Sequence, residues 1–281
     1  MIAPALPEDL AVALAGVARR AGPFAAHVVF HPTVGSTNDE AATLAIGGAP
    51  EGTMVLADEQ SAGRGRRGRS WHSPAGAGVY VSIVFRPSGT EQSSRHGSGP
   101  TTTLLTLMSG VAVAEGIRHA SALDVAIKWP NDIVVETGVG PRRRKVAGIL
   151  AEAAVSGGVL QHVIVGVGVN LRDAPRPREL AERATSLEGE LGRRCDRAPV
   201  VAALVASMAW WRQRMLAGDV PVVLQRWGEL SPSSRGARVR WEVPGGTRGG
   251  VTAGIDSEGA LLVDTPQGRE RIVAGELSWD E

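Results

Sequence analysis

A short loop between residues 60 and 71 combines glycines with closely spaced positive charges. It reads Gln60-Ser61-Ala62-Gly63-Arg64-Gly65-Arg66-Arg67-Gly68-Arg69-Ser70-Trp71, so residues 63–69 hold three glycines and four arginines. Glycines let backbone N–H groups approach a ligand closely. Four neighbouring guanidinium groups repel one another unless an anion lies between them, which favours a phosphate or polyphosphate. By composition alone, a solvated basic loop that touches RNA is the alternative.

The glycine spacing of this loop matches G-x-G-x-x-G at Gly63, Gly65 and Gly68, but we do not expect a dinucleotide-binding fold. That fingerprint requires a helix directly after it, and residues 69–74 do not start one. A Walker A loop is excluded because the chain contains no Gly-Lys pair. Any ATP must therefore be held in another way.

Lysine occurs at two positions, Lys128 and Lys145, among 30 basic residues. The first opens Lys128-Trp129-Pro130-Asn131-Asp132, where the proline favours an extended turn after a strand. Lys, Asn and Asp at such a turn suit a polar ligand or a metal-bridged phosphate, although a turn with a surface salt bridge is the simpler alternative. The second lysine opens an apolar strand, Lys145–Leu150, in which Gly148 indicates the close approach of a ligand or another backbone.

A fourth motif, Val165-Gly166-Val167-Gly168-Val169-Asn170, places two glycines on the same face of a strand. They leave a flat floor for a slim ligand, with tight packing under a helix as the alternative. The six histidines form no metal-ligand pattern, so we assign no metal site to the protein itself. Ser36 and Ser73 lack the G-x-S-x-G setting of a hydrolase nucleophile.

Composition narrows the class of protein. The 281 residues, 43% apolar and 21% charged, are enough for one large or two modest domains with a core. The net charge of +1 excludes a globally basic nucleic-acid binder. Cys195 is the single cysteine, which excludes an internal disulfide, and no apolar run approaches the roughly 18 residues of a membrane span. We therefore predict a cytoplasmic protein that does not enter a membrane.

The periodicity of the chain predicts an α/β (α+β) domain over residues 1–232 and a small β-barrel over residues 233–281. The first helix is expected over Pro7–Arg20, and Thr37 with Glu40 predicts a capping box that starts the second. Later helices are expected over 101–119, 199–217 and 220–230, and strands over 28–30, 53–57, 79–85, 125–127, 133–135, 146–153 and 161–170. Beyond Ser231, short alternating segments over 237–243, 249–255, 260–264 and 269–273 have the size of an SH3-like barrel. Residues 137–144 are expected to form a basic hairpin.

In chain order, Gly35–Asn38, the Gly/Arg loop, Lys128–Asp132, Lys145–Leu150 and Gly166–Asn170 closely resemble the biotin protein ligases. The resemblance covers roughly residues 28–281. It implies a class II synthetase-like mixed β-sheet flanked by helices, followed by an SH3-like β-barrel. It also implies a two-step reaction, in which biotin and ATP with Mg²⁺ give biotinyl-5′-AMP and pyrophosphate. A lysine of a biotin carboxyl carrier protein, an acyl-CoA carboxylase subunit, then accepts the biotinyl group and AMP leaves.

The same resemblance assigns roles to individual residues. Lys145 is expected to bridge the biotin carboxylate and the α-phosphate, Arg66 to lie in the loop that closes over the intermediate, and Asp132 to orient Mg²⁺ or accept the target lysine's proton. The expected biotin-binding residues are Ser36, Thr37, Asn38, Gln60, Gly63, Arg64, Arg66, Lys145, Gly148, Gly166 and Gly168. The expected ATP- and adenylate-binding residues are Arg64, Arg66, Arg67, Arg69, Trp71, Lys128, Asn131 and Asn170, with Trp71 stacking on adenine. The loop is expected to be mobile when empty, because its charges repel.

Two other functions compete with this one. A lipoate- or octanoate-type protein ligase performs similar chemistry, but this chain has Gly-Arg-Gly-Arg-Arg-Gly where such enzymes carry Arg-Arg with a Gly-Gly-Gly run. A non-enzymatic RNA-binding protein would use the Gly/Arg loop but leaves both lysine motifs unexplained. Some relatives carry an N-terminal DNA-binding domain, for which the position of Ser36 leaves no room, so we expect no DNA partner and no repressor activity. A homodimer is left open.

Overall fold

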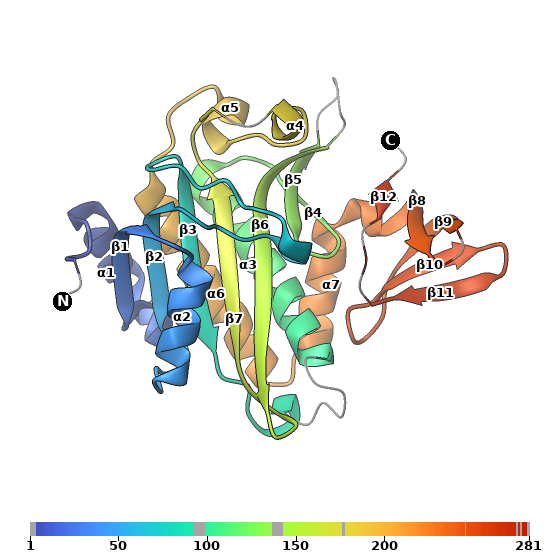
Figure 1. Ribbon diagram of the computed structural model, residues 1–281, viewed down its shortest axis with the longest axis horizontal. Coiled ribbons are helices and arrows are strands. Elements are labelled where there is room, and N and C mark those ends of the chain that lie inside the picture. Colours follow the sequence, from blue (N-terminus) through green and yellow to red (C-terminus); the bar gives the residue numbers. More distant parts are fainter. Residues whose placement is uncertain are drawn as a thin grey trace.

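A seven-stranded mixed sheet forms the centre of the larger domain (Figure 1). The computed structural model describes residues 4–92, 99–136, 143–175, 178–244, 246–273, 275 and 277–279. The strand order is β1-β2-β3-β7-β6-β5-β4; β1 and β2 are parallel, and the other neighbours are antiparallel. The strands are β1 Val28–Val34, β2 Met54–Gln60, β3 Gly78–Phe85, β4 Ala126–Lys128, β5 Asp132–Glu136, β6 Arg143–Ser156 and β7 Val159–Asn170.

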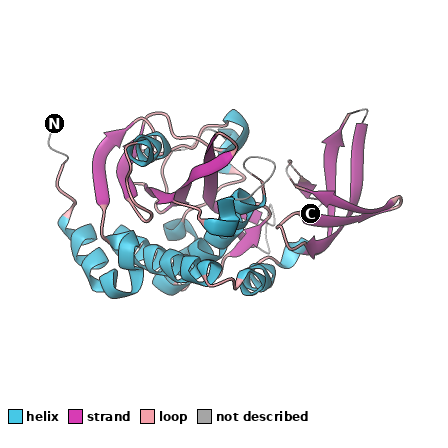
Figure 2. Ribbon diagram, turned by 90° about the horizontal axis from the view of Figure 1, so that it is seen from below, coloured by secondary structure: helices cyan, strands magenta, loops and turns pink. Residues whose placement is uncertain are grey.

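Helices cover both faces of this sheet, but unequally (Figure 2). The face that packs on the main core is covered by α1 Glu8–Ala21, α3 Pro100–Ser121, α6 Arg197–Leu216 and α7 Val220–Leu230. Helix α2, Thr37–Ile46, packs alone on the other face through a small cluster that includes Val55, Val84 and Ile164. Because side chains alternate along a strand, Ser82, Gly166 and Gly168 face the α2 side. The remaining helical segments are short: η1 Gly22–Ala25, η2 Arg66–Gly68, η3 Gly89–Gln92, α4 Arg178–Ala181, α5 Leu187–Leu191 and η4 Pro232–Ser234.

The C-terminal module is a five-stranded antiparallel sheet that docks on the lysine turn. Its order is β11-β10-β9-β8-β12, from strands β8 Arg235–Val243, β9 Gly246–Ile255, β10 Leu261–Thr265, β11 Gly268–Ile272 and β12 Ser278–Trp279. Trp129, 3% exposed, donates its indole N–H to the carbonyl of Gly259 over 3.1 Å. Gly259 has φ +84°, and a Cβ there would lie 2.6 Å from the Leu107 side chain of α3. The module thus supports the Lys128–Asp132 turn from outside.

The predicted helices and strands are present, with two differences. The capping box is wrong: the N-cap of α2 is Ser36, which makes no side-chain cap bond, and Thr37 lies in the first turn, where its hydroxyl donates to Gln60 instead. Helices α4 and α5 and strand β12 were not predicted. Residues 137–142 of the expected basic hairpin lie outside the described residues, whereas Arg143 and Arg144 open β6. None of the helices in the described part of the chain is both long and apolar enough to span a membrane.

Candidate active site

Three glycines of β6 and β7 form a flat floor on the α2 side of the sheet. Gly148 pairs with Gly168 across the two strands, and Gly166 lies two residues from Gly168. A Cβ on Gly168 would lie 2.4 Å from the indole nitrogen of Trp71, and one on Gly166 would lie 2.1 Å from the amide oxygen of Asn38. Gly166 and Gly168 therefore share one face of the strand, as expected, and Trp71 and Asn38 lie directly on that face. The indole N–H of Trp71 is buried without a hydrogen-bond partner in the described part of the chain.

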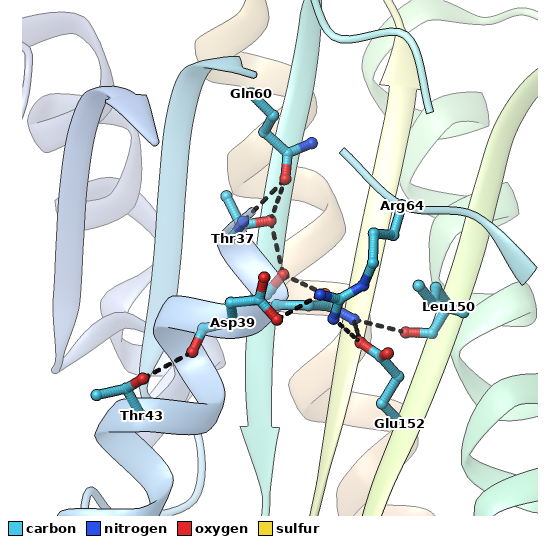
Figure 3. A network of polar contacts seen from close by, with 9 residues as sticks. Thr37, Asp39, Thr43, Gln60, Arg64, Leu150 and Glu152 are labelled. Carbon is cyan, nitrogen blue, oxygen red and sulfur yellow. Dashed lines mark hydrogen bonds and ion pairs between the residues drawn. The ribbon is translucent and has the colours of Figure 1, made fainter. Parts of the chain in front are cut away.

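A continuous set of polar contacts orders the wall beside this floor (Figure 3). Thr37 donates its backbone N–H and its hydroxyl to Gln60 Oε1, over 2.9 and 3.0 Å. Gln60 Nε2 donates to the Ser73 hydroxyl over 2.9 Å. Ser82 Oγ lies 2.8 Å from Thr37 Oγ1 and 2.6 Å from Asn38 Oδ1. The side-chain amides of Gln60 and Asn38 each have the oxygen facing a donor and the NH₂ group facing an acceptor, so the orientation of each amide is determined.

The Gly/Arg loop folds back on itself rather than leading into a helix. Gly65 N–H donates to the Arg69 carbonyl over 2.7 Å, and Trp71 N–H donates to the Gly63 carbonyl over 2.8 Å. Gly68 adopts φ +71° at the turn. No α-helix follows it before β3, which confirms the exclusion of a dinucleotide fingerprint. A Cβ on Gly63 would lie 2.5 Å from the Trp71 carbonyl oxygen, so this position requires glycine.

Two arginines of the loop reach the pocket and find different partners. Arg64 forms ion pairs with Asp39 and with Glu152, the latter over 2.7 Å. The hydrogen bond to Asp39, aided by Glu152 and opposed by burial, raises the pKa of Arg64. Arg66 donates to the side-chain amide oxygen of Asn131 over 3.1 Å. The sequence analysis missed Asp39 and Glu152; the available signal for Glu152 was its place four residues after Gly148, on the same face of β6.

Lys145 lines the pocket, and its ion-pair partner is Asp132, which is not among the lining residues. Its ammonium lies 2.5 Å from Asp132 Oδ1, and the two side chains are 30% and 28% exposed. The same ammonium is 5.1 Å from the ring centre of Trp71. The two residues belong to neighbouring strands, β6 and β5. The turn after Lys128 thus places a carboxylate beside the second lysine motif, which the sequence alone did not predict.

The backbone of Lys145 is held by a segment far along the chain. On the N-terminal side of Ala147, β6 no longer pairs with β7. There Lys145 exchanges backbone hydrogen bonds with Arg183 and Thr185, over 2.8 and 2.9 Å. Asn170 donates its side-chain amide to the Thr185 carbonyl over 2.9 Å. Asn170 therefore holds this segment in place, and its expected contact with adenine stays a prediction.

Most of the predicted site residues line one pocket, whereas six of them are not among its lining residues: Gly63, Arg67, Arg69, Lys128, Asp132 and Asn170. The lining residues are Ser36, Thr37, Asn38, Gln60, Arg64, Gly65, Arg66, Trp71, Asn131, Lys145, Gly148, Ile149, Leu150, Gly166, Val167 and Gly168. Arg67 and Arg69 are exposed outside it, and Lys128 lies 5.8 Å from the ring centre of Trp279 in β12. The pocket is partly open to solvent, and its free volume is about 50 Å³, room for only a few water molecules. Because Trp71 and Asn38 fill the rest of the floor, any larger ligand must displace the indole or the loop.

Both parts of the chain match known protein families. Residues 31–170 match the biotin/lipoate A/B protein ligase family, and residues 236–278 match the biotin protein ligase C-terminal domain. The chain is 37% identical over 254 residues to the bifunctional ligase/repressor BirA of Bacillus subtilis, an alignment that covers 89% of this chain and 73% of that relative. The chain belongs to the biotin/lipoate A/B protein ligase family.

Other members of the biotin/lipoate ligase family match over nearly their whole length. The biotin–[acetyl-CoA-carboxylase] ligase of Paracoccus denitrificans is 36% identical, with 86% of this chain and 96% of that relative covered. Among solved structures, the biotin protein ligase of Aquifex aeolicus in complex with biotin and ATP superposes with a TM-score of 0.74 at 26% identity, over 91% of this chain and 99% of that one. The predicted mixed sheet and C-terminal β module are thus the fold of these biotin ligases.

Proposed function

We propose that this chain is an ATP-dependent biotin protein ligase, which forms biotinyl-5′-AMP and transfers the biotinyl group to a lysine of a biotin carboxyl carrier protein. The observation that carries this is the Lys145–Asp132 pair beside a glycine floor and a polar wall. Relatives over this length are named for biotin ligation. The C-terminal match to a biotin ligase domain favours biotin over lipoate or octanoate. An RNA-binding protein would need neither lysine motif.

The first step joins an anion to a polyanion, so its main obstacle is charge repulsion. A carboxylate oxygen of biotin attacks the α-phosphorus of ATP, the bond to the β-phosphate oxygen breaks, and pyrophosphate leaves. The Lys145 ammonium and the Arg66 guanidinium lower this repulsion by supplying positive charge at the pocket. Mg²⁺ commonly reaches such sites with the nucleotide and one or two carboxylates. Asp132 suits that role and would help the ion offset phosphate charge, whereas Asn131 has both ends of its amide engaged.

In the second step the amine of the carrier lysine attacks the acyl carbon of the adenylate. The bond from that carbon to the AMP oxygen breaks, an amide forms, and the amine must lose a proton. Asp132 is the proposed acceptor of this proton, since it lies at the same end of the pocket as Lys145. Thr37, Asn38 and Gln60 supply polar groups for the ureido ring of biotin. The closed Gly/Arg loop keeps water from the mixed anhydride.

Pyrophosphate release from ATP and Mg²⁺ tests the function. We expect release with biotin and none with lipoate, octanoate or no acid. Addition of a biotin carboxyl carrier domain should then give one added biotinyl group on a single lysine, measured by mass spectrometry. Release with lipoate alone would reassign the substrate. A folded sample with no release from any acid would contradict the ligase function, and salt-dependent RNA binding would then be measured.

Three narrower expectations stay predictions. The single cysteine suits a reducing cytoplasm. The absence of a DNA partner is tested by titration with duplex DNA. A homodimer is tested by sedimentation with and without the adenylate.

A further inference from the structure

The guanidinium of Arg64 is neutralised before any substrate arrives. Asp39, in the first turn of α2, and Glu152, on β6, both form ion pairs with it. The three groups together carry a formal charge of −1. A guanidinium whose donors face two carboxylates attracts phosphate weakly. Arg64 is thus poorly suited to the adenylate-binding role expected from the sequence.

Glu152 also controls a second pocket residue. The same oxygen that meets Arg64, Oε2, accepts a hydrogen bond from Asn38 Nδ2 over 2.6 Å. A carboxylate only accepts, so it holds the NH₂ end of the Asn38 amide toward itself and turns the oxygen toward Ser82. The amide consequently lies flat on Gly166, where a Cβ would be 2.1 Å away. Glu152 lies outside the pocket but touches two of the residues that line it.

We infer that Glu152, with Asp39, is a positioning residue for adenylate retention. It ties the start of the Gly/Arg loop to β6 and α2 through Arg64, and it orients Asn38 on the floor (Figure 3). Arg64 acts as the tether of the loop. This inference rests on the proposed ligase function. Its consequence is kinetic: loss of the tether accelerates opening of the loop and release of biotinyl-5′-AMP without changing its formation.

The test compares Glu152→Gln with a matched control. Gln keeps the shape and one acceptor oxygen but removes the charge. Exposed ion pairs contribute modestly, so we expect adenylate release to accelerate about two- to five-fold, with the formation rate at saturating substrates within about two-fold of wild type. Asp264→Asn breaks a more exposed ion pair, with Arg269 in the C-terminal module, and should change neither rate. High salt should accelerate release from the wild type and leave Glu152→Gln less affected.

Trypsin provides a readout that needs no catalysis. Loosening of the tether should let the loop unfold locally more often, and trypsin cuts a chain only where it is locally unfolded. Ligand-free Glu152→Gln should therefore be cut after Arg66, Arg67 or Arg69 several-fold faster than wild type, as located by mass spectrometry. Unchanged release and unchanged cleavage in a folded Glu152→Gln protein would overturn the inference. If that variant does not fold, Asp39→Asn tests the same tether, because Asp39 is 62% exposed. Wild-type protein that makes no adenylate would refute the proposed function, while the cleavage comparison would still decide whether Glu152 holds the loop.

Discussion

Lys145 and Asp132 form an ion pair of 2.5 Å across neighbouring strands, at the end of a glycine floor. The pair brings together the two motifs that contain the chain's two lysines, since Asp132 ends the motif that Lys128 begins. Under the proposed function, the positive charge for the activation step and the proton acceptor for the transfer step would stand side by side. We therefore expect substitution of Lys145 to affect chiefly the first half-reaction and substitution of Asp132 chiefly the second.

Removal of the Lys145 ammonium should abolish activation. We expect Lys145→Ala to slow biotin-dependent pyrophosphate release by about 100-fold or more, the usual cost of losing one group that stabilises transition-state charge. The fold should persist, because Lys145 joins its neighbours through backbone hydrogen bonds. Single-turnover formation of the adenylate measures the effect, with thermal unfolding as the control. An unchanged rate would refute the charge-bridging role.

Asp132 should matter chiefly for transfer. We expect Asp132→Asn to slow acyl transfer to the carrier lysine by about 100-fold, the lower end of the range for a general base. Preformed biotinyl-5′-AMP isolates this step, and biotinylation of the carrier is followed by mass spectrometry. Raising the pH should partly restore transfer, since more of the acceptor amine is then unprotonated. Equal loss at every pH would contradict the proton-acceptor role.

A methyl group on the pocket floor should block the ligand. Gly168→Ala places a Cβ 2.4 Å from the Trp71 indole, a rigid group that must then shift. Overpacking of this kind costs about 1–3 kcal/mol, so we expect biotin affinity to fall about ten-fold or more. Gly16→Ala in α1, where nothing lies within 4 Å, is the matched control. Isothermal titration with biotin compares the two, and equal affinities would show that the ligand does not use this floor.

Arg66 should govern how long the intermediate stays bound. We expect Arg66→Ala to accelerate dissociation of biotinyl-5′-AMP about ten-fold, in line with the loss of one charge-assisted hydrogen bond. The leaked intermediate should appear in solution, by chromatography, as excess pyrophosphate over carrier biotinylation. Dissociation at the wild-type rate would remove Arg66 from the adenylate site.

Acid should destabilise the turn of the C-terminal module that holds Asp256 and Gly259, whose carbonyl accepts the Trp129 hydrogen bond. Burial acts to raise the pKa of Asp256, but hydrogen bonds from Arg271 and from the Ala260 and Glu258 amides outweigh it, so the pKa lies below its ordinary value. A lowered folded-state pKa stabilises the fold above the unfolded value of about 3.9, and this stabilisation is lost as the pH falls through the folded value.

Asp256→Asn isolates this charge, because Asn keeps an acceptor for the backbone amides. We expect the free energy of unfolding to fall by about 1 kcal/mol at pH 7 and the difference from wild type to shrink at about pH 2. Asp124→Asn, which changes a carboxylate that is 90% exposed, is the control. Urea denaturation at both pH values gives the comparison, and a difference that grows toward low pH would refute the assignment.

Local patterns predicted much of the fold and the pocket floor. Gly166 and Gly168 share a face because strands repeat every two residues, and that rule needs no tertiary information. The capping box predicted at the start of α2 is wrong because the Thr37 hydroxyl donates to Gln60 instead. Gln60 comes close to Thr37 only when β2 pairs with β1. Local propensity is thus overridden where a distant strand supplies a better partner.

The contacts that complete the site were not predictable in this way. Glu152 contacts both Arg64 and Asn38, and the three residues come from separate segments of the chain. No local sequence pattern links these three residues. The position of Asn170 indicated a ligand contact, but its side-chain amide donates to the Thr185 carbonyl. Helix α5, Leu187–Leu191, is too short for its periodicity to be seen. The misses at Glu152 and Asn170 both concern a pairing between distant segments.

The pairing of β3 with β7 has a consequence for biosynthesis. All eight residues of β3 are buried, and the pairing sets Ser82 opposite Gly166. On the ribosome, β3 emerges well before β7, with α3, β4, β5 and β6 made in between. Throughout that interval an apolar strand presents an open edge, the feature most prone to misassembly in a nascent chain. The same pairing that builds the glycine floor thus leaves this edge of β3 unpaired until synthesis reaches Asn170.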